Sequence, residues 1–428
     1  MNQIIRPNSQ ADIVDILLAD TAIRVQLSPT NYNLAVSRAA AVSDYIDRPD
    51  SSLHGRVITT YAQGSMAINA TIARKLRTDE FDIDLIAQIR FPPGTTAKQA
   101  LDELYRAIRG EPGSRYYDMV ERRNRCVTVH YADGMHLDIT PAVLAPEKMA
   151  RTSVIFHHKP EDRSDATGYL LWANPFGFAE WFKALTPATD AFRRYYSNRL
   201  QKWAASDMAR AEQLARADME PVPEQTPAHE KSLAVIALQL LKRNRNVRYD
   251  KRDARRPPSV LLSKFAADAA LPTGSLYDQL LRMAQHARRE IGAAHDQNRL
   301  VRVTNPRCED DVLTDRWPAT PKDQETYLGD LDRLTYQLGL LQQEECGLRE
   351  MQAILSDLFG ENPTGEVIKS YAGRLGAAIE TGQAYQEHGT GRIDAVRSGL
   401  AAPALVGAAP SKSFAAPRHG FYGSEPPK

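Results

Sequence analysis

One stretch constrains the fold of this chain more than any other, namely Tyr61–Ile89 with the sequence YAQGSMAINATIARKLRTDEFDIDLIAQI. A short helix is predicted to begin at Gly64-Ser65, with Ser65 as its N-cap residue. Backbone N–H groups at a helix N-terminus favour a bound phosphate, and Gly64 has no Cβ to keep a phosphate away. The pattern predicts a phosphate-binding turn followed by a strand.

The strand carries two carboxylates on one face. Phe81, Ile83 and Leu85 alternate with Asp82 and Asp84. Residues i and i+2 of a strand point to the same side, with their Cα atoms roughly 7 Å apart. An isolated Asp-x-Asp is usually a solvated face, since the chain has 53 acidic residues. Beside a phosphate site, however, paired carboxylates can hold a divalent metal ion against a triphosphate.

A third carboxylate is predicted on a β-hairpin. The segment RCVTVHYADGMHLDIT has two alternating runs around Asp133-Gly134, which is a strong hairpin signal. Asp138 lies on the polar side of the second run, where an acidic residue is disfavoured unless that face is wet or functional. Asp138 is therefore either a solvent-facing residue or a metal ligand, and the two aspartates of the earlier strand favour the ligand.

The composition excludes several classes of protein. The 428 residues are 43% hydrophobic and 25% charged, as expected for a soluble globular chain of two or three domains. The net charge of +1 gives no general drive toward nucleic acid or a membrane. Cys126, Cys308 and Cys346 form neither a disulfide framework nor a zinc motif. No apolar run approaches the ~20 residues of a membrane span, and no signal peptide pattern is present. We expect a cytoplasmic monomer.

The motifs resemble a known family. The order GS, FDIDL and HLDI is similar to that of the DNA polymerase β-like nucleotidyltransferases. The fuller text, YAQGS…TI…DEFDIDL, HLDITPAV and ANPFGFAEWF, resembles the bacterial cGAS/DncV-like nucleotidyltransferases. The likeness extends to about Phe359, and Asn69 departs from it because the family pattern has a glycine there.

This resemblance implies a fold and an activity. The fold is α/β, with a polymerase β-like sheet braced by N-terminal helices, a C-terminal helical lobe, and the active site in the cleft between the lobes. The activity is synthesis of a cyclic di- or trinucleotide from NTPs with release of pyrophosphate, in anti-phage defence signalling, without a nucleic acid. The alternatives are another template-independent nucleotidyltransferase (RNA tailing, tRNA repair, small-molecule or protein nucleotidylylation) and, in a different class, an interaction protein that has lost its chemistry.

The expected site residues follow. Two Mg²⁺ ions, with Mn²⁺ as the alternative, lie roughly 4 Å apart and are held by three catalytic carboxylates, Asp82, Asp84 and Asp138. The residues expected to bind the nucleotide are Gly64, Ser65, Lys231, Ser259 and Asn174. Lys231 and Ser259 resemble the family's triphosphate ligands, and Asn174 is a base contact. A basic run over 242–256 is either a solvated face or a counter-charge to the triphosphate.

The domain organisation is predicted from helical spacing and breaks. Bracing helices occupy 1–50, the catalytic domain 51–219, the helical lobe 228–400 and a flexible tail 401–428, with a proline-rich linker at 220–227. Helices are predicted over 13–23, 31–46, 97–109, 276–291, 327–359 and 365–387. His157 and His158 are predicted to be exposed. The family resemblance implies that the tail docks operon-encoded regulatory or conjugating proteins.

Overall fold

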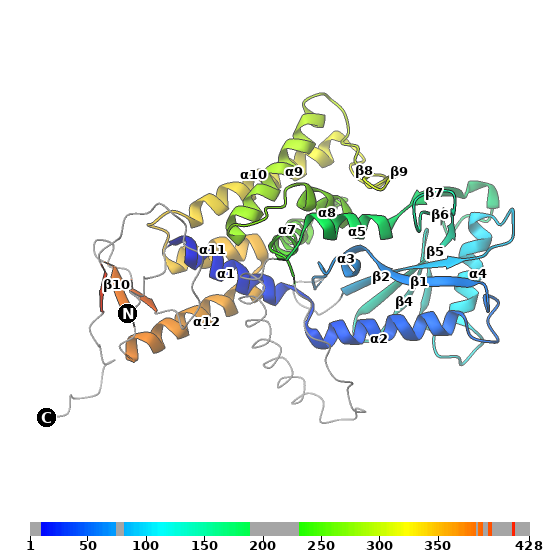
Figure 1. The fold of residues 1–428 in the computed structure, drawn as a ribbon, viewed down its shortest axis with the longest axis horizontal. Coiled ribbons are helices and arrows are strands. Elements are labelled where there is room, and N and C mark those ends of the chain that lie inside the picture. The colour runs from blue at the N-terminus through cyan, green and yellow to red at the C-terminus, as the bar shows by residue number, and fades with distance from the viewer. Residues whose placement is uncertain are drawn as a thin grey trace.

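The computed structural model describes residues 10–73, 81–188 and 231–381, together with the backbone of three short strands at 384–387, 393–395 and 413–415. Figure 1 shows a sheet at one end of the molecule and a group of helices at the other. The predicted linker at 220–227 and the catalytic-domain boundary at 219 lie outside the described residues.

The lobe predicted to be catalytic, which we call the catalytic lobe, is built on a seven-stranded mixed sheet of order β1-β2-β5-β4-β3, in which β6 pairs with β5 and β7 pairs with β6. The strands β2 and β5 run parallel, and the other pairs are antiparallel. The strands are β1 Val57–Gln63, β2 Phe81–Ile89, β3 Val120–Arg122, β4 Val127–His130, β5 Met135–Leu144, β6 Ser153–His157 and β7 Tyr169–Ala173.

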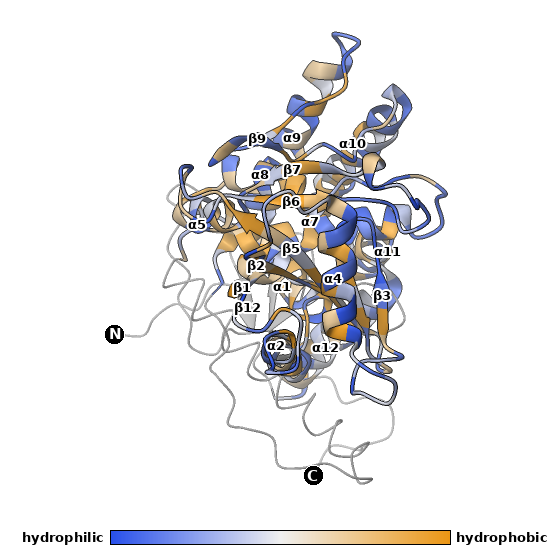
Figure 2. Cartoon of the chain, turned by 90° about the vertical axis from the view of Figure 1, so that its right-hand side faces the viewer, coloured by the Kyte–Doolittle hydropathy of each residue, from blue (hydrophilic) through white to orange (hydrophobic). Residues whose placement is uncertain are grey.

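Two helices cover one face of this sheet. α2, Pro29–Ile46, begins at its N-cap Ser28, and α4, Ala97–Arg109, begins with a capping box between Thr96 and Gln99. Both pack on the apolar side chains of β2 and β5, such as Ile83. Figure 2 shows the apolar colouring of the strands beside the polar outer turns of α4. The opposite face carries the polar residues of β2 and β5, as the alternation predicted.

The helical lobe surrounds α7, whose residues from Leu233 to Arg245 are all buried. Its helices are α1 Gln10–Val25, α5 Pro175–Leu185, α7 Leu233–Tyr249, α8 Ser259–Asp268, α9 Leu276–His295, α10 Pro321–Leu341, α11 Leu348–Phe359 and α12 Glu361–Glu380. The prediction that both N-terminal helices brace the sheet is correct for α2 only, because α1 packs on α7, α9 and α12. None of the helices in the described ranges has the length and apolarity to cross a membrane.

Two predicted helices have different bounds. The helix expected over 327–359 is interrupted between Leu341 and Leu348, where Cys346 is buried in the core and Gly347 is the N-cap of the next helix. The helix expected over 365–387 ends at Glu380. It is followed by β10, Ala384–Glu387, which pairs with β11, Ile393–Ala395, and with β12, Ser413–Ala415. The predicted tail therefore contributes a strand, through backbone pairing that its composition did not indicate.

A second small sheet connects the two lobes. The strands β8, Thr304–Asn305, and β9, Cys308–Val312, form a hairpin between α9 and α10. The Asn305 amide donates to the carbonyl oxygen of Asn174 at 2.9 Å. The carboxylate of Asp311 accepts from the backbone N–H of Asn174 at 3.1 Å. This hairpin reaches the catalytic lobe at the corner between β7 and α5 (Figure 1).

Candidate active site

The two central aspartates lie side by side. In the parallel pair of β2 and β5, Asp84 lies directly opposite Asp138, and Gln63 of β1 and Thr128 of β4 continue the same row across the sheet. Neighbouring strands are about 4.8 Å apart, so the two carboxylates share one small area of the polar face. The hydroxyl of Thr128 donates to Oδ1 of Asp138 at 2.5 Å and orients that carboxylate.

Asp82 is paired through its backbone with His136 of β5, one step along the same strands. Its side chain lies outside what the structure describes. That Asp82 shares the face of Asp84 therefore stays a prediction.

The Asp84 carboxylate lies so close to Gly64 that no side chain fits at this position. Gly64 has a φ of +58°, and a Cβ built on it would lie 2.9 Å from Oδ2 of Asp84. Both the left-handed backbone and this close approach exclude an ordinary side chain. The sequence predicted that the missing Cβ lets a phosphate approach at Gly64, and this stays a prediction. The group that lies close to Gly64 in the structure is the carboxylate of Asp84.

The helix after Gly64 differs in detail from the prediction. α3, Gly64–Ala67, begins directly after β1, so its N-cap is Gln63 and Ser65 is its second residue. The prediction of Ser65 as the N-cap is therefore wrong by two positions. Asn69 has a φ of +56°, a conformation that glycine adopts freely and that asparagine tolerates better than most residues. This explains how asparagine can replace the glycine of the family pattern.

The helical lobe holds the segment that follows α3. Nζ of Lys242 donates to the carbonyl oxygen of Ala70 at 2.8 Å, and the amide of Gln239 donates to the carbonyl oxygen of Thr71 at 2.9 Å. Burial, followed by the charge of Arg245, lowers the pKa of Lys242 to about 7, while the nearby Asp84 carboxylate opposes this shift. Lys242 thus lies next to the catalytic face. In the sequence Lys242 is the first residue of a basic run, but its spacing from the buried apolar residues of α7 also indicates a buried position.

Lys231 lies just before α7, whose N-cap is Ser232. Its ammonium group donates to Oε1 of Gln26 at 2.6 Å, and burial lowers its pKa to about 7. Gln26 also forms an isolated backbone bridge with Ile72. Lys231 is therefore placed near the segment that follows the phosphate-binding turn, on the same side as Lys242.

Ser259 is the first residue of α8, and its hydroxyl oxygen accepts from both terminal nitrogens of Arg245 at 3.2 Å. The guanidinium also donates to the carbonyl oxygen of Pro257 at 2.7 Å. Because the Ser259 oxygen accepts from an arginine, its own O–H remains a donor for an anionic ligand.

Part of the basic run is structural, which neither prediction for it anticipated. Arg243 donates to the carbonyl oxygen of Phe359 at 2.9 Å. Arg252 pairs with Asp330 at 2.5 Å. These contacts hold α7 and the loop after it against α10 and α11, so Arg243 and Arg252 are neither a solvated face nor a counter-charge to a triphosphate.

The prediction of Asn174 as a base contact is wrong in this structure. Asn174 is 0% exposed and is the N-cap of α5, where its side-chain oxygen accepts from the N–H of Gly177 at 2.7 Å. Its amide nitrogen donates to the hydroxyl of Thr152 at 2.8 Å. A side chain that is fully buried and bonded in this way has no surface to offer a base.

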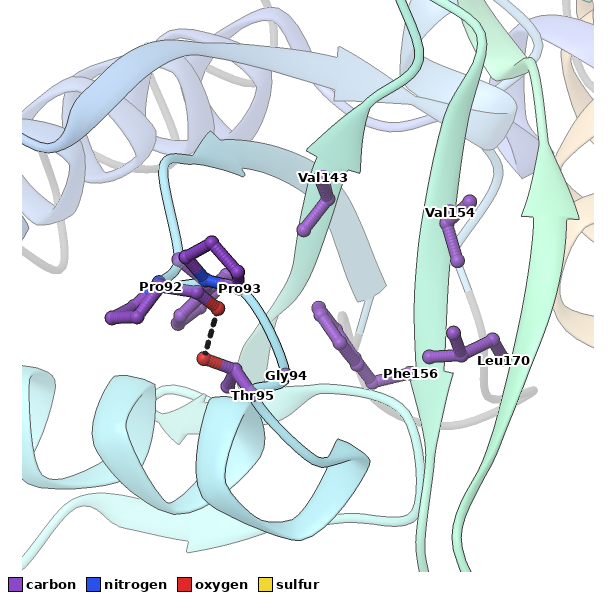
Figure 3. A pocket seen from close by; sticks show the side chains of 9 residues that line it. Pro92, Pro93, Gly94, Thr95, Val143, Val154, Phe156 and Leu170 are labelled. Atoms are coloured by element: carbon purple, nitrogen blue, oxygen red, sulfur yellow. Dashed lines mark hydrogen bonds between the residues drawn. The ribbon is translucent and has the colours of Figure 1, made fainter.

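The apolar pocket in Figure 3 is a separate feature. It has a volume of about 260 Å³ and is lined by apolar residues such as Phe91, Phe156 and Leu170. It lies beyond the C-terminal end of β2, whereas Asp84 is in the first half of that strand. Its lining has no carboxylate and no cation, so it does not suit a nucleotide.

The residues present fit a divalent metal ion. Mg²⁺ prefers carboxylate oxygens, and Asp84 and Asp138 supply two carboxylates from adjacent strands. Among the side chains that the structure describes, no group of three metal-binding residues is found. The third expected ligand, the carboxylate of Asp82, is not among those side chains.

The chain is similar to known proteins. Residues 12–154 match a family model described as the Second Messenger Oligonucleotide or Dinucleotide Synthetase domain. The cyclic dinucleotide synthase CdnG of Bradyrhizobium diazoefficiens is 38% identical over 411 residues, covering 95% of this chain and 94% of the relative. The c-di-GMP synthase of Roseivirga ehrenbergii is 22% identical over 422 residues, 98% of this chain and 100% of the relative.

A solved structure extends the likeness to the fold. The structure of the Bradyrhizobium diazoefficiens CD-NTase CdnG in complex with GTP has a TM-score of 0.70 at 37% identity, covering 84% of this chain and 100% of that chain. Together with the paired aspartates, the similarity along nearly the whole length shows that this chain belongs to the bacterial cGAS/DncV-like nucleotidyltransferases.

Proposed function

We propose that the chain joins two nucleoside triphosphates, GTP among them, into a cyclic dinucleotide and releases pyrophosphate. The observation that carries the proposal is the pairing of Asp84 with Asp138 on adjacent strands, with the Asp84 carboxylate against Gly64. The relative that is 38% identical is named a cyclic dinucleotide synthase, and its solved structure contains GTP. Both facts support a guanine nucleotide as a substrate.

Asp82, Asp84 and Asp138 would hold two Mg²⁺ ions, with Mn²⁺ as the alternative. When bound, the ions would neutralise the triphosphate and make a ribose hydroxyl more acidic. The Thr128 hydroxyl, which donates to Oδ1 of Asp138, would keep that carboxylate in a fixed orientation for this task. Carboxylates oriented in this way are costly to replace even by asparagine, because the amide removes the charge.

The two joining steps form and break the same kinds of bonds. A ribose hydroxyl oxygen of the acceptor nucleotide forms a bond to the α-phosphorus of the donor, and the bond from that phosphorus to pyrophosphate breaks. The hydroxyl proton passes to the Asp138 carboxylate or to solvent, and pyrophosphate leaves with the electron pair. The second step uses the acceptor's own triphosphate and closes the ring.

The remaining residues would bind the donor triphosphate. Gly64 and Ser65 present backbone groups at the start of α3, and Ser259 offers its hydroxyl. Lys231 and Lys242 supply positive charge from the helical lobe. Charge-assisted hydrogen bonds to the leaving pyrophosphate would stabilise the charge that develops on it.

The setting that we propose is cytoplasmic anti-phage signalling by a monomer, as the family resemblance supports. Operon-encoded regulatory or conjugating proteins would dock on the C-terminal tail. Deletion of the tail in cells challenged with phage would test this role, since loss of protection with normal synthesis in vitro is expected.

Product analysis tests the activity. Purified protein is incubated with Mg²⁺ and the four NTPs, without an acceptor, and the products are separated and weighed by mass spectrometry. We expect a cyclic dinucleotide that contains guanine. Parallel reactions with RNA or protein acceptors separate the other nucleotidyltransferase activities, and extension of those acceptors without any cyclic product would overturn the proposal.

A further inference from the structure

Three arginines meet where the helical lobe faces the catalytic sheet. Nη2 of Arg125, in the segment between β3 and β4, lies 2.6 Å from the carboxylate of Asp315. Arg255, in the segment between α7 and α8, donates to the carbonyl oxygen of Arg316 at 2.9 Å. Arg125, Arg255 and Arg316 therefore gather around one turn of the chain, with Asp315 as their acidic neighbour; we call them the arginine cluster.

The arginine cluster lies beside the catalytic carboxylates. Cys126 follows Arg125 in the chain, and its thiol pKa is raised by burial and then by the negative charges of Asp138 and Asp84, while Arg316 opposes the rise. Arg316 and Asp138 thus both lie near this thiol. Strand alternation gives Cys126 the face of Thr128, whose hydroxyl is bonded to Asp138.

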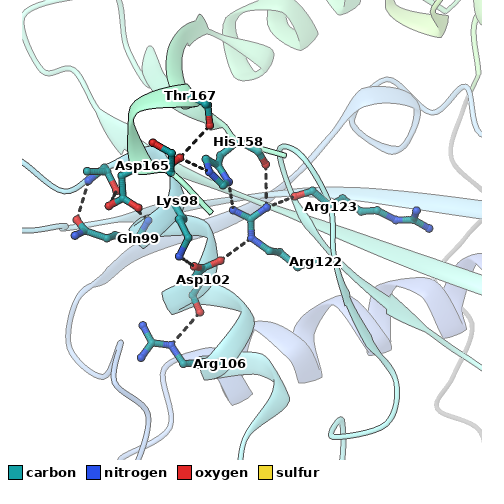
Figure 4. Close-up of polar contacts among 11 residues, drawn as sticks. Lys98, Gln99, Asp102, Arg106, Arg122, Arg123, His158, Asp165 and Thr167 are labelled. Atoms are coloured by element: carbon teal, nitrogen blue, oxygen red, sulfur yellow. Dashed lines mark hydrogen bonds and ion pairs between the residues drawn. The ribbon is translucent and has the colours of Figure 1, made fainter. Parts of the chain in front are cut away.

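Arg125 is held in place by the chain around it. Figure 4 shows Arg122 donating to Oδ1 of Asp102 at 2.7 Å and to the carbonyl oxygen of His158 at 2.9 Å. The backbone N–H of His158 donates in turn to the carbonyl oxygen of Asn124, the residue before Arg125, at 2.9 Å.

The same contacts bury His158, which is only 1% exposed. Its ring is enclosed by Arg122 and the carbonyl of Ser164, so the prediction that His158 is exposed is wrong.

The cluster has an unused donor and excess positive charge. Nε of Arg125 is buried and finds no hydrogen-bond partner among the described residues. A buried donor without an acceptor is rare and indicates a missing partner such as an ion. Burial and the charge of Arg125 lower the pKa of Arg316. Three guanidinium groups outnumber the two carboxylates near Arg125, those of Asp315 and Asp311, and the excess positive charge favours an anion. Arg255 and Arg316 are exposed, so a ligand can reach them.

We propose that the arginine cluster binds the 5′-triphosphate of the acceptor nucleotide, the one whose ribose hydroxyl attacks. This inference rests on the proposed function. Ring closure requires an acceptor that keeps its triphosphate, because that triphosphate is the leaving group of the second step. Gly64, Ser65, Lys231, Lys242 and Ser259 are occupied by the donor, so a second set of cations is needed. The planar fork of arginine matches phosphate oxygens.

The test isolates the first step. The donor is 2′,3′-dideoxy-GTP, which has no hydroxyl to act as an acceptor. One acceptor is the α,β-methylene analogue of GTP, which carries a triphosphate but cannot release pyrophosphate. The other acceptor is GMP, which has no triphosphate. The donor can form only one phosphodiester bond with either acceptor. The rate of pyrophosphate release, measured at increasing acceptor concentration, gives the KM of each acceptor.

We expect wild-type protein to have a KM about tenfold or more lower for the methylene analogue than for GMP, since each charge-assisted contact contributes on this scale. In Arg125→Gln and Arg316→Gln the two values should come within about threefold, with the KM of GMP unchanged. Arg289→Gln removes an exposed positive charge from α9 and should retain the wild-type ratio. An unchanged ratio in both cluster variants would overturn the inference.

The variant Asp315→Asn shows whether the arginine cluster binds an anion or only links the two lobes structurally. If the pair of Arg125 and Asp315 only connects the lobes, Asp315→Asn and Arg125→Gln should lower the melting temperature and raise both KM values alike. If the cluster binds the triphosphate, Asp315→Asn removes a competing negative charge, so the KM of the methylene analogue should fall while Arg125→Gln raises it. Wild-type protein that makes no cyclic product from GTP would contradict the proposed function instead.

Discussion

The ammonium group of Lys242, on the central helix α7, donates a 2.8 Å hydrogen bond to the carbonyl oxygen of Ala70. The backbone N–H of Ala70 donates in turn to the carbonyl oxygen of Ser65 at 2.9 Å. One buried lysine therefore connects the helical lobe to the phosphate-binding turn at Gly64-Ser65. The lobe fixes the position of that turn, in addition to supplying charge near Asp84.

The first prediction concerns the two buried lysines. Lys242→Met should lower kcat/KM for the NTP by about a hundredfold, because it removes both a charge near Asp84 and the anchor of Ala70. Lys231→Met should mainly raise the KM, by about tenfold. Steady-state kinetics at saturating Mg²⁺ provide the measurement. Lys322→Met, which removes an exposed charge on α10, is the control. Equal kinetics for all three variants would show that neither buried lysine acts on the nucleotide.

The same lysines predict a pH dependence of stability. Burial lowers the pKa of Lys242 and of Lys231 from 10.5 to about 7. Between these values the unfolded chain binds more protons than the folded chain, so the free energy of unfolding of nucleotide-free protein rises as the pH rises from about 7 toward 10.5. Urea unfolding at several pH values measures this slope. Lys242→Met should reduce it, and a slope identical to wild type would be inconsistent with a buried, easily deprotonated lysine.

A third prediction uses two glycines with positive φ. Gly64→Ala should lower the rate of product formation by about a hundredfold, which corresponds to about 2.7 kcal/mol, because a Cβ would lie 2.9 Å from the Asp84 carboxylate. Gly94→Ala is a matched control, since Gly94 has a φ of +81° and nothing lies within 4 Å of its added Cβ. Both variants carry backbone strain, but only Gly64→Ala should lose activity. Equal loss in both would attribute the effect to strain alone.

The carboxylates give a fourth prediction. Asp84→Asn, alone or with Asp82→Asn, and Asp138→Asn keep the shape of the side chain and remove its charge. Each protein should fold with a melting temperature near that of wild type and should form no detectable product. Calorimetric titration with Mn²⁺ in the presence of GTP should also show weaker metal binding. Normal synthesis by any of these variants would remove that residue from the site.

The sequence was sufficient for the parts of the site that depend on local periodicity. Alternation predicted the strands β2 and β5, and Asp133-Gly134 predicted the hairpin of β4 and β5; both are confirmed. That Asp82 shares the face of Asp84 stays a prediction. The parallel register that brings Asp84 beside Asp138 depends on the pairing of strands far apart in the chain. Local patterns do not contain that register, so it was implied only by the resemblance.

Other features depended on tertiary contacts. Asn174 has the polarity of a ligand, but Thr152 and the N-terminus of α5 occupy its amide. The sequence alone suggests that the basic run beginning at Lys242 is solvated. In the structure α7 is enclosed by other helices, and arginines such as Arg243 donate to carbonyl oxygens of those helices. The break between α10 and α11 arises where Cys346 is buried, which helical spacing alone does not indicate.

A fifth prediction concerns the tail. A chain that ends after Ala401 loses β12, which pairs only with β10 among the described strands. β10 and β11 contact α12, far in sequence from the catalytic residues. The shortened protein should therefore fold and make its product at a rate within about twofold of wild type. Loss of synthesis on truncation would show that the tail supports the active site.

The central claim is that two nucleotides are joined twice to form a ring, and the ratio of pyrophosphate released to nucleotide incorporated tests it most directly. The reaction contains purified protein, Mg²⁺ and GTP, with the other NTPs added in turn, and no other acceptor. Two joining steps per ring release one pyrophosphate for every nucleotide incorporated, and this is the ratio that the proposed synthesis of a cyclic dinucleotide predicts. A single joining step gives a linear dinucleotide and one pyrophosphate for every two nucleotides, and that ratio, or no release at all, would contradict the account.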